Sequence, residues 1–201
     1  MSRQAIKTGV IVFDGAEELD IVGVWEVLGV ASNMSKEKYF ELHSIGLGET
    51  PVKCAHGLTI VPSEPLSDLS KYDIVIVPGG GYLRGTTGVK VAAKNQLLLE
   101  TIRKTGEAGK LICSVCTGAF VLAKSGILKG RKATTHYMVI EEMKSWAEGV
   151  TPVKQKTVLD GNVLTGAGIS SSIDTGLKIV ELVLGKNLAS QVSEYMMYSP
   201  A

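Results

Sequence analysis

The most constraining feature of the sequence is a short apolar run that ends at a cluster of glycines. Residues Asp73–Val77 read DIVIV, with four β-branched residues in five, and Pro78–Gly81 follow directly as PGGG. β-Branched residues favour extended strands, whereas proline and glycine end them. A strand with so few polar positions has no face to turn toward water, so both of its sides must be covered. The run therefore predicts a buried central strand that ends in a glycine loop.

Strand-like and helix-like segments alternate on both sides of this run. Before it, Lys7–Phe13 and Phe40–Gly46 are typical of strands, and Leu19–Ala31 between them has apolar residues at helical spacing. After it, Val89–Lys104 has helical periodicity and Lys110–Cys113 is again a short apolar strand. This order predicts an α/β fold in which a mostly parallel central sheet has helices on both faces.

The remaining segments fit the same architecture. They comprise two hairpins, Val52–Val61 and Val153–Thr165, and the helices Thr117–Ala123, Met138–Ala147, Ser172–Leu184 and Leu188–Met197. The sequence contains no internal repeat, no low-complexity tract and no stretch with the composition of a linker. Residues 1–201 are therefore expected to form a single domain.

Charge and composition favour a soluble protein with a small ligand. The chain has 21 Lys and Arg residues against 20 Asp and Glu residues, so neither nucleic acid nor an anionic membrane is expected as a partner. A small neutral ligand fits this balance better. No apolar window approaches the roughly 18 residues of a membrane span. The short apolar run near the N-terminus lacks the cleavage pattern of a signal peptide.

The three cysteines, Cys54, Cys113 and Cys116, favour a reduced, cytoplasmic protein. Their odd number and their spacing match neither a disulfide framework nor a zinc site, so no metal is expected. In LICSVCTGAF, residues 111–120, Cys113 lies within the expected strand, where core packing is the simpler interpretation. Cys116 lies where the strand gives way to a helix, whose N–H groups favour a thiolate. From the motif alone, a reactive Cys116 and a buried, inert one both remain open.

An acidic loop, GAEELD at residues 15–20, follows the first expected strand. In open α/β sheets, ligands bind outside the carboxyl ends of the strands, where the glycine loop and the Cys116 turn are also expected. A carboxyl group there could carry a proton or orient a water for the thiol. Asp20 lies at the start of the first helix, where the helix dipole stabilises a carboxylate. Spacing alone does not choose among Glu17, Glu18 and Asp20.

The glycine loop and the histidines are the other candidates. The amides of Gly79–Gly81 could receive a developing negative charge, although a tight connection is the simpler alternative. The run is not a phosphate loop, because no Gly-Lys-Ser/Thr follows it. His43 and His56 are expected to be structural or solvent-facing. His136, 20 residues beyond Cys116, is the better candidate for a role in the site.

Four segments in this order, GAEELD, VIVPGGG, CSVCTGAFVLAKSGILKGRKATTHY and VLDGNVLTGAGISSSIDTGL, resemble the ThiJ/PfpI superfamily. The resemblance runs roughly from Lys7 to Tyr198. It implies the class I glutamine-amidotransferase-like fold, a flavodoxin-like sandwich with a nucleophile-elbow cysteine, and a homodimer. Within the superfamily, the SVCTG turn with the ATTH and LTGAGI segments is most similar to isocyanide hydratases and to the amidotransferase-like domain of AraC-type regulators.

The resemblance implies a role for individual residues. Cys116 is then the nucleophile. Asp20 is the interacting acid, because the family has its acid at the last position of the GAEELD segment, which sets Glu17 and Glu18 aside. We expect the pocket walls to come from Asp20–Trp25, from the glycine loop and from Gly166–Ser172.

Two further residues complete the site that the resemblance implies. The backbone amides of Gly80 and Thr117 fall where the family forms its anion-binding pocket. The Thr117 side chain matches the residue beside the nucleophile in isocyanide hydratases. Protease-like and amidotransferase-like relatives have a histidine at this position, which activates the cysteine. Thr117 therefore disfavours a Cys-His protease or amidase mechanism.

The resemblance therefore implies a cofactor-free hydratase that adds water to a small isocyanide and releases an N-formamide. A thioimidate would form on Cys116, with Asp20 assisting proton transfer. One alternative is a glyoxalase or deglycase acting on α-oxoaldehydes such as methylglyoxal, with His136 near the thiol. The other is a redox- or ligand-sensing domain related to AraC-type regulators, in which Cys116 is an oxidisable thiol. With one domain expected and no basic surface, a DNA-binding regulator is not expected.

Overall fold

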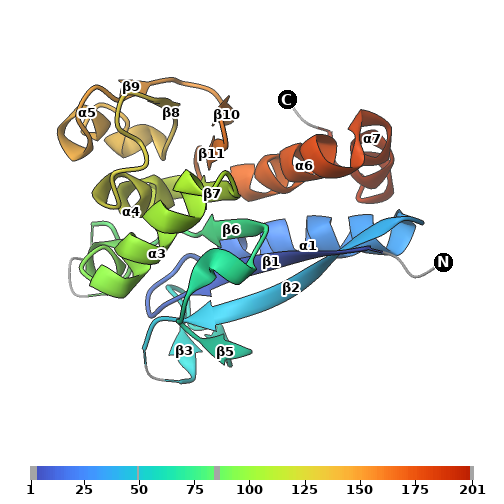
Figure 1. The fold of residues 1–201 in the computed structure, drawn as a ribbon, viewed down its shortest axis with the longest axis horizontal. Helices are drawn as coiled ribbons and strands as arrows, with labels where there is room; N and C mark the ends of the chain where they lie inside the picture. Colours follow the sequence, from blue (N-terminus) through green and yellow to red (C-terminus); the bar gives the residue numbers. More distant parts are fainter. Residues whose placement is uncertain (1–3, 49, 84–86, 200–201) are drawn as a thin grey trace.

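The computed structural model describes residues 4–48, 50–83 and 87–199. Its main sheet has 7 strands in the order β10-β11-β7-β6-β1-β2-β5 (Figure 1). Neighbouring strands are parallel except β10, which is antiparallel to β11. The strands are β1 (Gln4–Val12), β2 (Lys38–Gly46), β5 (Glu64–Pro65), β6 (Ile74–Val77), β7 (Leu111–Val115), β10 (Thr157–Asp160) and β11 (Val163–Gly166). The prediction of a mostly parallel α/β sheet is confirmed.

The DIVIV run forms the centre of this sheet, as predicted. Ile76 of β6 pairs with Val10 of β1 on one side and with Cys113 of β7 on the other. All four residues of β6 are buried. An apolar strand covered on both faces and paired along both edges loses all of its contact with water, which is why this segment contains no polar side chain.

Helices flank the sheet in two groups. Helices α1 (Glu18–Met34), α6 (Ser171–Leu184) and α7 (Lys186–Tyr195) pack against one another, and α4 (Ala119–Lys124) packs against α2 (Val89–Ala92) and α3 (Gln96–Glu107). The reason lies in the strand order. The chain moves from β1 to β2 in one direction along the sheet and from β6 to β7 in the other, so right-handed crossovers place α1 and α3 on opposite faces.

Two helix predictions are wrong. The segment Val89–Lys104 is not one helix, because Asn95 interrupts it and its side chain accepts a hydrogen bond from the Leu98 N–H at 3.0 Å, capping α3. The predicted helix Met138–Ala147 is divided into a 3-10 turn, η3 (Tyr137–Val139), and the short α5 (Met143–Trp146). Trp146 packs there against the rings of Tyr82 and Phe120, so tertiary packing overrides the local helical period.

The smaller elements follow the predictions more closely. The first hairpin is confirmed, and the second is confirmed with its first strand beginning at Thr157 instead of Val153. The elements not yet named are β3 (Val52–Lys53), β4 (Thr59–Ile60), η1 (Leu69–Lys71), η2 (Cys116–Gly118), β8 (Lys132–Ala133) and β9 (Thr151–Pro152). None of the helices in the described ranges is long and apolar enough to cross a bilayer.

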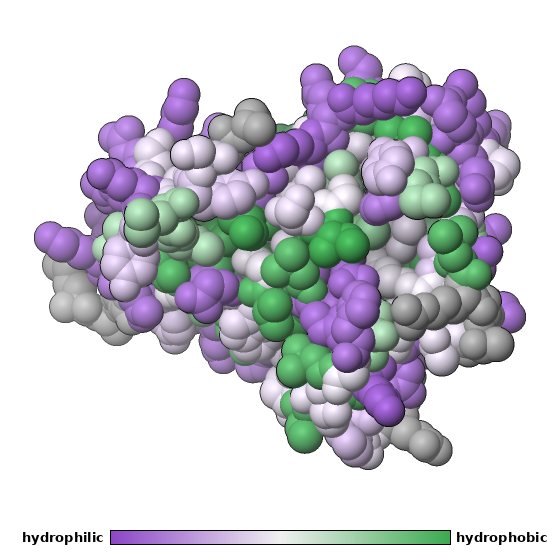
Figure 2. Space-filling view, turned by 180° about the vertical axis from the view of Figure 1, so that it is seen from behind, coloured by the Kyte–Doolittle hydropathy of each residue, from purple (hydrophilic) through white to green (hydrophobic). Residues whose placement is uncertain are grey.

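The exposed apolar surface bears on the predicted homodimer. Seen from the side opposite to Figure 1, hydrophobic residues gather in the middle of the face and hydrophilic residues occupy most of its margin (Figure 2). On α1, Val22 is 41% exposed, whereas Ile21 and Val24 are buried in the core. Because most of the apolar residues of α1 are used inside the chain, its composition does not require a second copy, and the homodimer stays a prediction.

Candidate active site

The candidate site lies where the strand order reverses, between β1 and β6. The loops after β1 and β6 are joined there by two hydrogen bonds. The Gly79 N–H donates to Asp20 Oδ2 at 2.9 Å, and the Glu17 N–H donates to the Gly79 carbonyl at 3.0 Å. Because β7 is the other neighbour of β6, Cys116 at its end reaches the same place. The three sequence segments that were predicted to meet are thus brought together at one edge of the sheet.

Cys116 occupies a strained turn between strand and helix. Its φ is +54°, in the left-handed region that non-glycine residues rarely enter. The turn is held from outside, because the Thr135 hydroxyl donates a hydrogen bond to the Cys116 carbonyl at 2.9 Å. Cys113 lies within β7 and is fully buried. The two cysteines therefore differ as predicted in their placement, one in the core and one on a nucleophile-elbow-like turn.

Close packing of backbone against backbone fixes this turn. A Cβ atom at Gly118 would lie 2.2 Å from the Val77 carbonyl oxygen at the end of β6. A Cβ atom at Gly79 would lie 2.5 Å from the Thr117 nitrogen and 3.0 Å from the Cys116 Cβ. Only glycine fits either position, so the glycine loop and the cysteine turn can approach each other closely.

Replacing Gly118 with alanine is expected to destabilise the protein. Because the added methyl group meets rigid backbone, we expect the free energy of unfolding to fall by about 2–3 kcal/mol. The matched control is Gly29→Ala in α1, where no atom lies within 4 Å of the new Cβ. That variant should be more stable by about 0.5–1 kcal/mol. Urea denaturation of both variants tests this, and equal stabilities would contradict it.

Thr117 supplies the polar contacts of the thiol. Its backbone N–H and its hydroxyl both lower the pKa of the Cys116 thiol. The hydroxyl oxygen in turn accepts the Gly80 N–H at 3.0 Å. The amide of Gly80 is therefore already occupied, and it acts on the sulfur through the Thr117 hydroxyl. This differs from the expectation that the Gly80 and Thr117 amides face an anion side by side.

Asp20 is the buried acid behind the thiol. Its side chain is fully buried, Oδ2 accepts from Gly79, and Oδ1 has no hydrogen-bond partner among the described residues. Burial raises the pKa of Asp20 well above its ordinary value, and the charge of Glu17 raises it further. The neutral, protonated carboxyl group is therefore favoured, with an O–H available on the unpartnered oxygen.

The pKa of Cys116 corrects one prediction. We expected the helix terminus to favour the thiolate, and the N–H and hydroxyl of Thr117 do lower the pKa of Cys116. Burial raises it by more, and the charge of Asp20 adds to the increase, so the pKa of this thiol lies above its ordinary value. A proton on Asp20 removes the second of these causes. The thiol and the carboxyl group therefore act as a coupled pair.

A pocket of about 200 Å³ opens onto Cys116 and Thr117. Its lining residues are Glu17, Gly80, Gly81, Tyr82, Leu83, Cys116, Thr117, His136, Met138, Val139 and Ile169. The glycine loop and Ile169, within Gly166–Ser172, contribute as predicted. The expectation that Asp20–Trp25 forms a wall is wrong, because these residues belong to α1 and the acidic loop contributes Glu17 to the lining instead.

His136 lies in the wall of the same pocket, which the sequence could not place. Its Nδ1 accepts the Met138 N–H at 3.4 Å, so the neutral ring carries its proton on Nε2. Burial lowers the pKa of His136. The other two histidines lie elsewhere. His43 faces Glu41 and Glu64, and His56 faces the acidic loop.

One group of side chains has the spacing of metal ligands. The donor atoms of Glu17, Glu18 and His56 lie within 4.8 Å of one another. Glu18 already accepts from the ring Nδ1 of His56 at 2.9 Å and from its backbone N–H at 2.6 Å. An ion pair satisfies these groups without a cation, and the expectation that no metal is needed stays a prediction.

The chain matches a known protein family over most of its length. The family model described as "DJ-1/PfpI family" matches residues 7–182. The chain belongs to the DJ-1/PfpI family. It is 30% identical over 197 residues to "Isonitrile hydratase" of Pseudomonas putida, covering 98% of this chain and 80% of that protein. It is also 30% identical over 174 residues to a "Glutathione-independent glyoxalase" of Caenorhabditis elegans, covering 86% and 85%.

A solved structure agrees with the fold. The crystal structure of a "THiJ/PfpI family protein" from Pseudomonas syringae superposes with a TM-score of 0.84 at 27% identity, covering 100% of this chain and 77% of that one. The predicted ThiJ/PfpI resemblance and the flavodoxin-like architecture are both confirmed.

Two residues of this DJ-1/PfpI site escaped the sequence analysis. Thr135 belongs to the ATTH segment, and its bond to the Cys116 carbonyl becomes visible only in three dimensions. Glu17 was set aside in favour of Asp20, although it is the acid that lines the pocket. The sequence offers no signal that separates them, because residues three apart at the start of a helix share a face.

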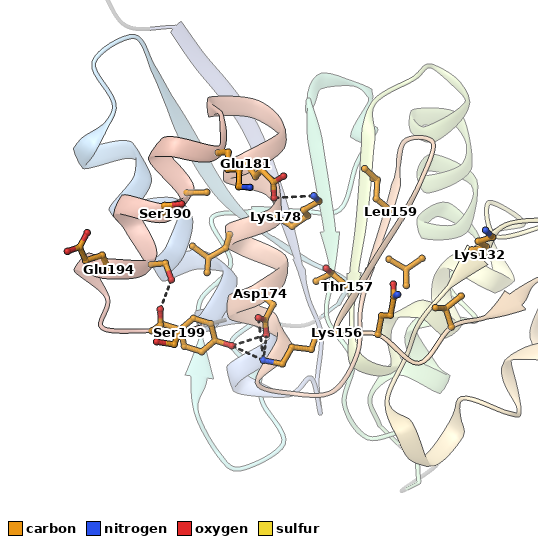
Figure 3. Close-up of a pocket in the computed structure, with 18 residues that line it drawn as sticks. Lys132, Lys156, Thr157, Leu159, Asp174, Lys178, Glu181, Ser190, Glu194 and Ser199 are labelled. Atoms are coloured by element: carbon orange, nitrogen blue, oxygen red, sulfur yellow. Dashed lines mark hydrogen bonds and ion pairs between the residues drawn. The ribbon is translucent and has the colours of Figure 1, made fainter. Parts of the chain in front are cut away.

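A larger hollow, of about 1070 Å³, lies between β10 and helices α6 and α7 (Figure 3). None of its described lining residues is a cysteine or a histidine. Four of its charged groups are paired, since Tyr198 donates to Asp174 at 2.8 Å, Lys156 lies 3.4 Å from Asp174, and Lys178 lies 3.1 Å from Glu181. In this DJ-1/PfpI chain the smaller pocket is therefore the one with reactive groups.

Proposed function

We propose that this DJ-1/PfpI protein is a cysteine-dependent hydratase that adds water to a small isocyanide and releases an N-formamide. One observation carries the proposal: the polar groups of Thr117 and the buried carboxyl group of Asp20 both act on the thiol of Cys116. The Pseudomonas putida relative named "Isonitrile hydratase" supports it. Thr117, and not a histidine, follows Cys116 in the chain. In our proposal the carboxyl group of Asp20 therefore takes the place of the imidazole of a Cys-His pair.

The chemistry proceeds in two balanced steps. The sulfur of Cys116 bonds to the terminal carbon of the isocyanide. Asp20 delivers its proton to that carbon and takes the thiol proton in exchange, which gives a thioimidate, R–N=CH–S. Water then adds to the same carbon and one of its protons passes to the nitrogen. The carbon–sulfur bond breaks, the sulfur recovers a proton, and R–NH–CHO leaves.

Polar groups around the sulfur support both steps. The Thr117 N–H and hydroxyl stabilise the negative charge on sulfur during attack and during departure. Because the carboxyl group of Asp20 is neutral before the reaction, it places no negative charge beside the sulfur, and the thiol proton that it takes in exchange restores its neutral form after it donates. No organic cofactor or metal takes part in this proposal.

Glyoxalase-type chemistry is the second candidate, and a specific observation favours it. His136 lines the pocket with Cys116, and the Caenorhabditis elegans relative is named as a glyoxalase. A neutral imidazole could move the proton between the two carbons of a hemithioacetal formed from an α-oxoaldehyde. The glyoxalase proposal therefore needs His136 to transfer a proton, whereas the hydratase proposal does not.

Substitution of His136 with asparagine should separate the two. The Asn oxygen can still accept the Met138 N–H, so the local turn is kept. We expect isocyanide turnover to change by no more than about threefold, because His136 transfers no proton in the hydratase mechanism. Glyoxalase turnover should fall roughly 10²–10⁴-fold if His136 is its general base. Formamide is measured by NMR with an aliphatic isocyanide and lactate with methylglyoxal. If the native protein forms only lactate and the variant loses this activity, glyoxalase chemistry replaces our proposal.

A redox-sensing role is the alternative of another class, and it would use the same Cys116 thiol as the hydratase. Oxidation proceeds through the thiolate, and both burial and the raised pKa of Cys116 disfavour that form. We also propose the cytoplasm as the compartment, since Cys54, Cys113 and Cys116 are all free and buried. The homodimer stays a proposal that light scattering can test.

A further inference from the structure

The pocket above Cys116 is lined by one acidic side chain and no basic one among the described residues. Among its described lining residues Glu17 is the only carboxylate, and none is lysine or arginine. The other titratable lining groups are His136, whose lowered pKa leaves the ring neutral near pH 7, and Tyr82 and Cys116, whose raised pKa values favour their neutral forms. Glu17 is thus the one carboxylate among the described lining residues, and the two charges that contact Tyr82, those of Lys90 and Glu142, are opposite in sign.

Glu17 is only weakly neutralised by its surroundings. Its Oε1 lies 3.4 Å from the His56 ring, which is 65% exposed and closer to Glu18, at 2.9 Å. The charge of Glu17 still reaches the reacting groups, because it raises the pKa of both Asp20 and Cys116. An anion entering this pocket would meet the same repulsion.

The mouth of the pocket is apolar. Leu83, Met138 and Ile169 all line it and are 76%, 59% and 37% exposed. We call these three residues the apolar rim. Large apolar side chains left in water beside a reactive group are available to cover an apolar part of a ligand.

We propose that Glu17 and the apolar rim select neutral electrophiles with an apolar substituent and exclude anionic ones. Glu17 is then a specificity-determining residue. The inference rests on the proposed function only in taking Cys116 as the attacking group, and it names the substrate class of that site. A simple aliphatic or alicyclic isocyanide fits this class, whereas an isocyanide or oxoaldehyde that carries a carboxylate or phosphate does not.

Two alkylating reagents of nearly equal size test the charge selection directly. Iodoacetamide is neutral and iodoacetate is anionic. With either reagent, the carbon–sulfur bond forms as iodide leaves, and the thiol proton passes to solvent. Rates at Cys116 are followed by peptide mass spectrometry, which separates this thiol from Cys54 and Cys113, with EDTA present to exclude metal effects. The ratio of the two rates cancels any change in the thiolate fraction.

The informative variant is Glu17→Gln, with Glu18→Gln as its matched control. Both remove one negative charge at the start of α1, but only Glu17 lines the pocket. We expect Glu17→Gln to raise the ratio of iodoacetate to iodoacetamide rates about fivefold to tenfold, from the loss of one nearby charge in a partly dehydrated pocket. Glu18→Gln should change it by less than about twofold. An unchanged ratio in Glu17→Gln, or an equal rise in both variants, overturns the proposal.

The rim is tested with N-cyclohexylmaleimide and N-methylmaleimide, which add to the thiol in the same way and differ only in the apolar substituent. Met138→Gln should lower the ratio of cyclohexyl to methyl rates about threefold or more, because it removes apolar contact surface. A ratio equal to that of the native protein contradicts a role for the rim. Because these assays need no turnover, they can succeed even if no isocyanide is hydrated, so failure of this inference and failure of the hydratase proposal are separate results.

Discussion

Substitution of Cys116 with alanine is expected to reduce isocyanide turnover by about a thousandfold or more. Without the sulfur no thioimidate can form, and what remains is the background reaction in a pocket that still binds substrate. The measurement is formation of the N-formamide, followed by NMR under conditions in which the native protein gives many turnovers. Retention of a tenth or more of the native rate would remove Cys116 from the mechanism and with it the proposed function.

The control for this variant lies three residues earlier in the chain. Cys113→Ala removes the same thiol from β7, where Cys113 is fully buried and does not line the pocket. We expect it to cost about 1–2 kcal/mol of stability through the small cavity that it leaves, with turnover retained. Cys116→Ala should be less destabilising, because alanine and cysteine meet the same strain at a φ of +54°. Activity and stability should therefore respond in opposite order at the two sites.

The second large effect is expected for Asp20→Asn, which should lower turnover by roughly 10²–10⁴-fold. Asparagine can still accept the Gly79 N–H through its oxygen, so the loops after β1 and β6 stay joined. It cannot exchange protons with the thiol and the isocyanide carbon. Turnover at the native level would show that Asp20 does not carry the proton.

The same variant has a signature in the pH dependence of stability. Because the pKa of Asp20 is raised in the folded protein, the native state binds a proton that the unfolded chain has already released. Its contribution to stability is complete below the ordinary aspartate pKa of about 4 and is lost as the pH rises toward the raised value. Asparagine does not titrate. The stability of Asp20→Asn relative to the native protein should therefore increase with pH above about 4, as measured by thermal denaturation.

A constant or falling difference between the two proteins would contradict a raised pKa for Asp20. Turnover and stability thus test separate properties of one side chain, and a variant that is inactive but at least as stable as the native protein near neutral pH would support both.

The arrangement of strands could be predicted because it depends on local composition. β6 has no polar residue, and Pro78 and Gly79 can only end it, so its central place followed from side-chain chemistry. The helix boundaries depended on contacts between distant residues. The cap at Asn95 competes with the helical period of its neighbours, and Trp146 is fixed by Tyr82 and Phe120. No window of the sequence contains these contacts.

Most residues of the candidate site could be predicted from the sequence, but the directions of their side chains could not. The placement of Cys116 on a turn and of Cys113 in the core followed from their positions relative to the strand. The sequence could not show that Glu17 faces the pocket while Asp20 lies buried behind the thiol. It also could not show that burial outweighs the helix terminus in setting the pKa of Cys116, since desolvation depends on the whole fold.

The hydrogen bond from Gly80 to Thr117 has a consequence for the timing of catalysis. A threonine hydroxyl can rotate, so its single proton can point in several directions. A reaction is slower if the hydroxyl must first rotate into one of them. Here the Thr117 hydroxyl oxygen accepts the Gly80 N–H at 3.0 Å, which restricts its rotation, and the same hydroxyl lowers the pKa of the Cys116 thiol. The orientation is therefore selected while the chain folds, before any substrate arrives. Charge that develops on the sulfur meets a dipole that is already aligned, so the surroundings need not reorganise during the reaction.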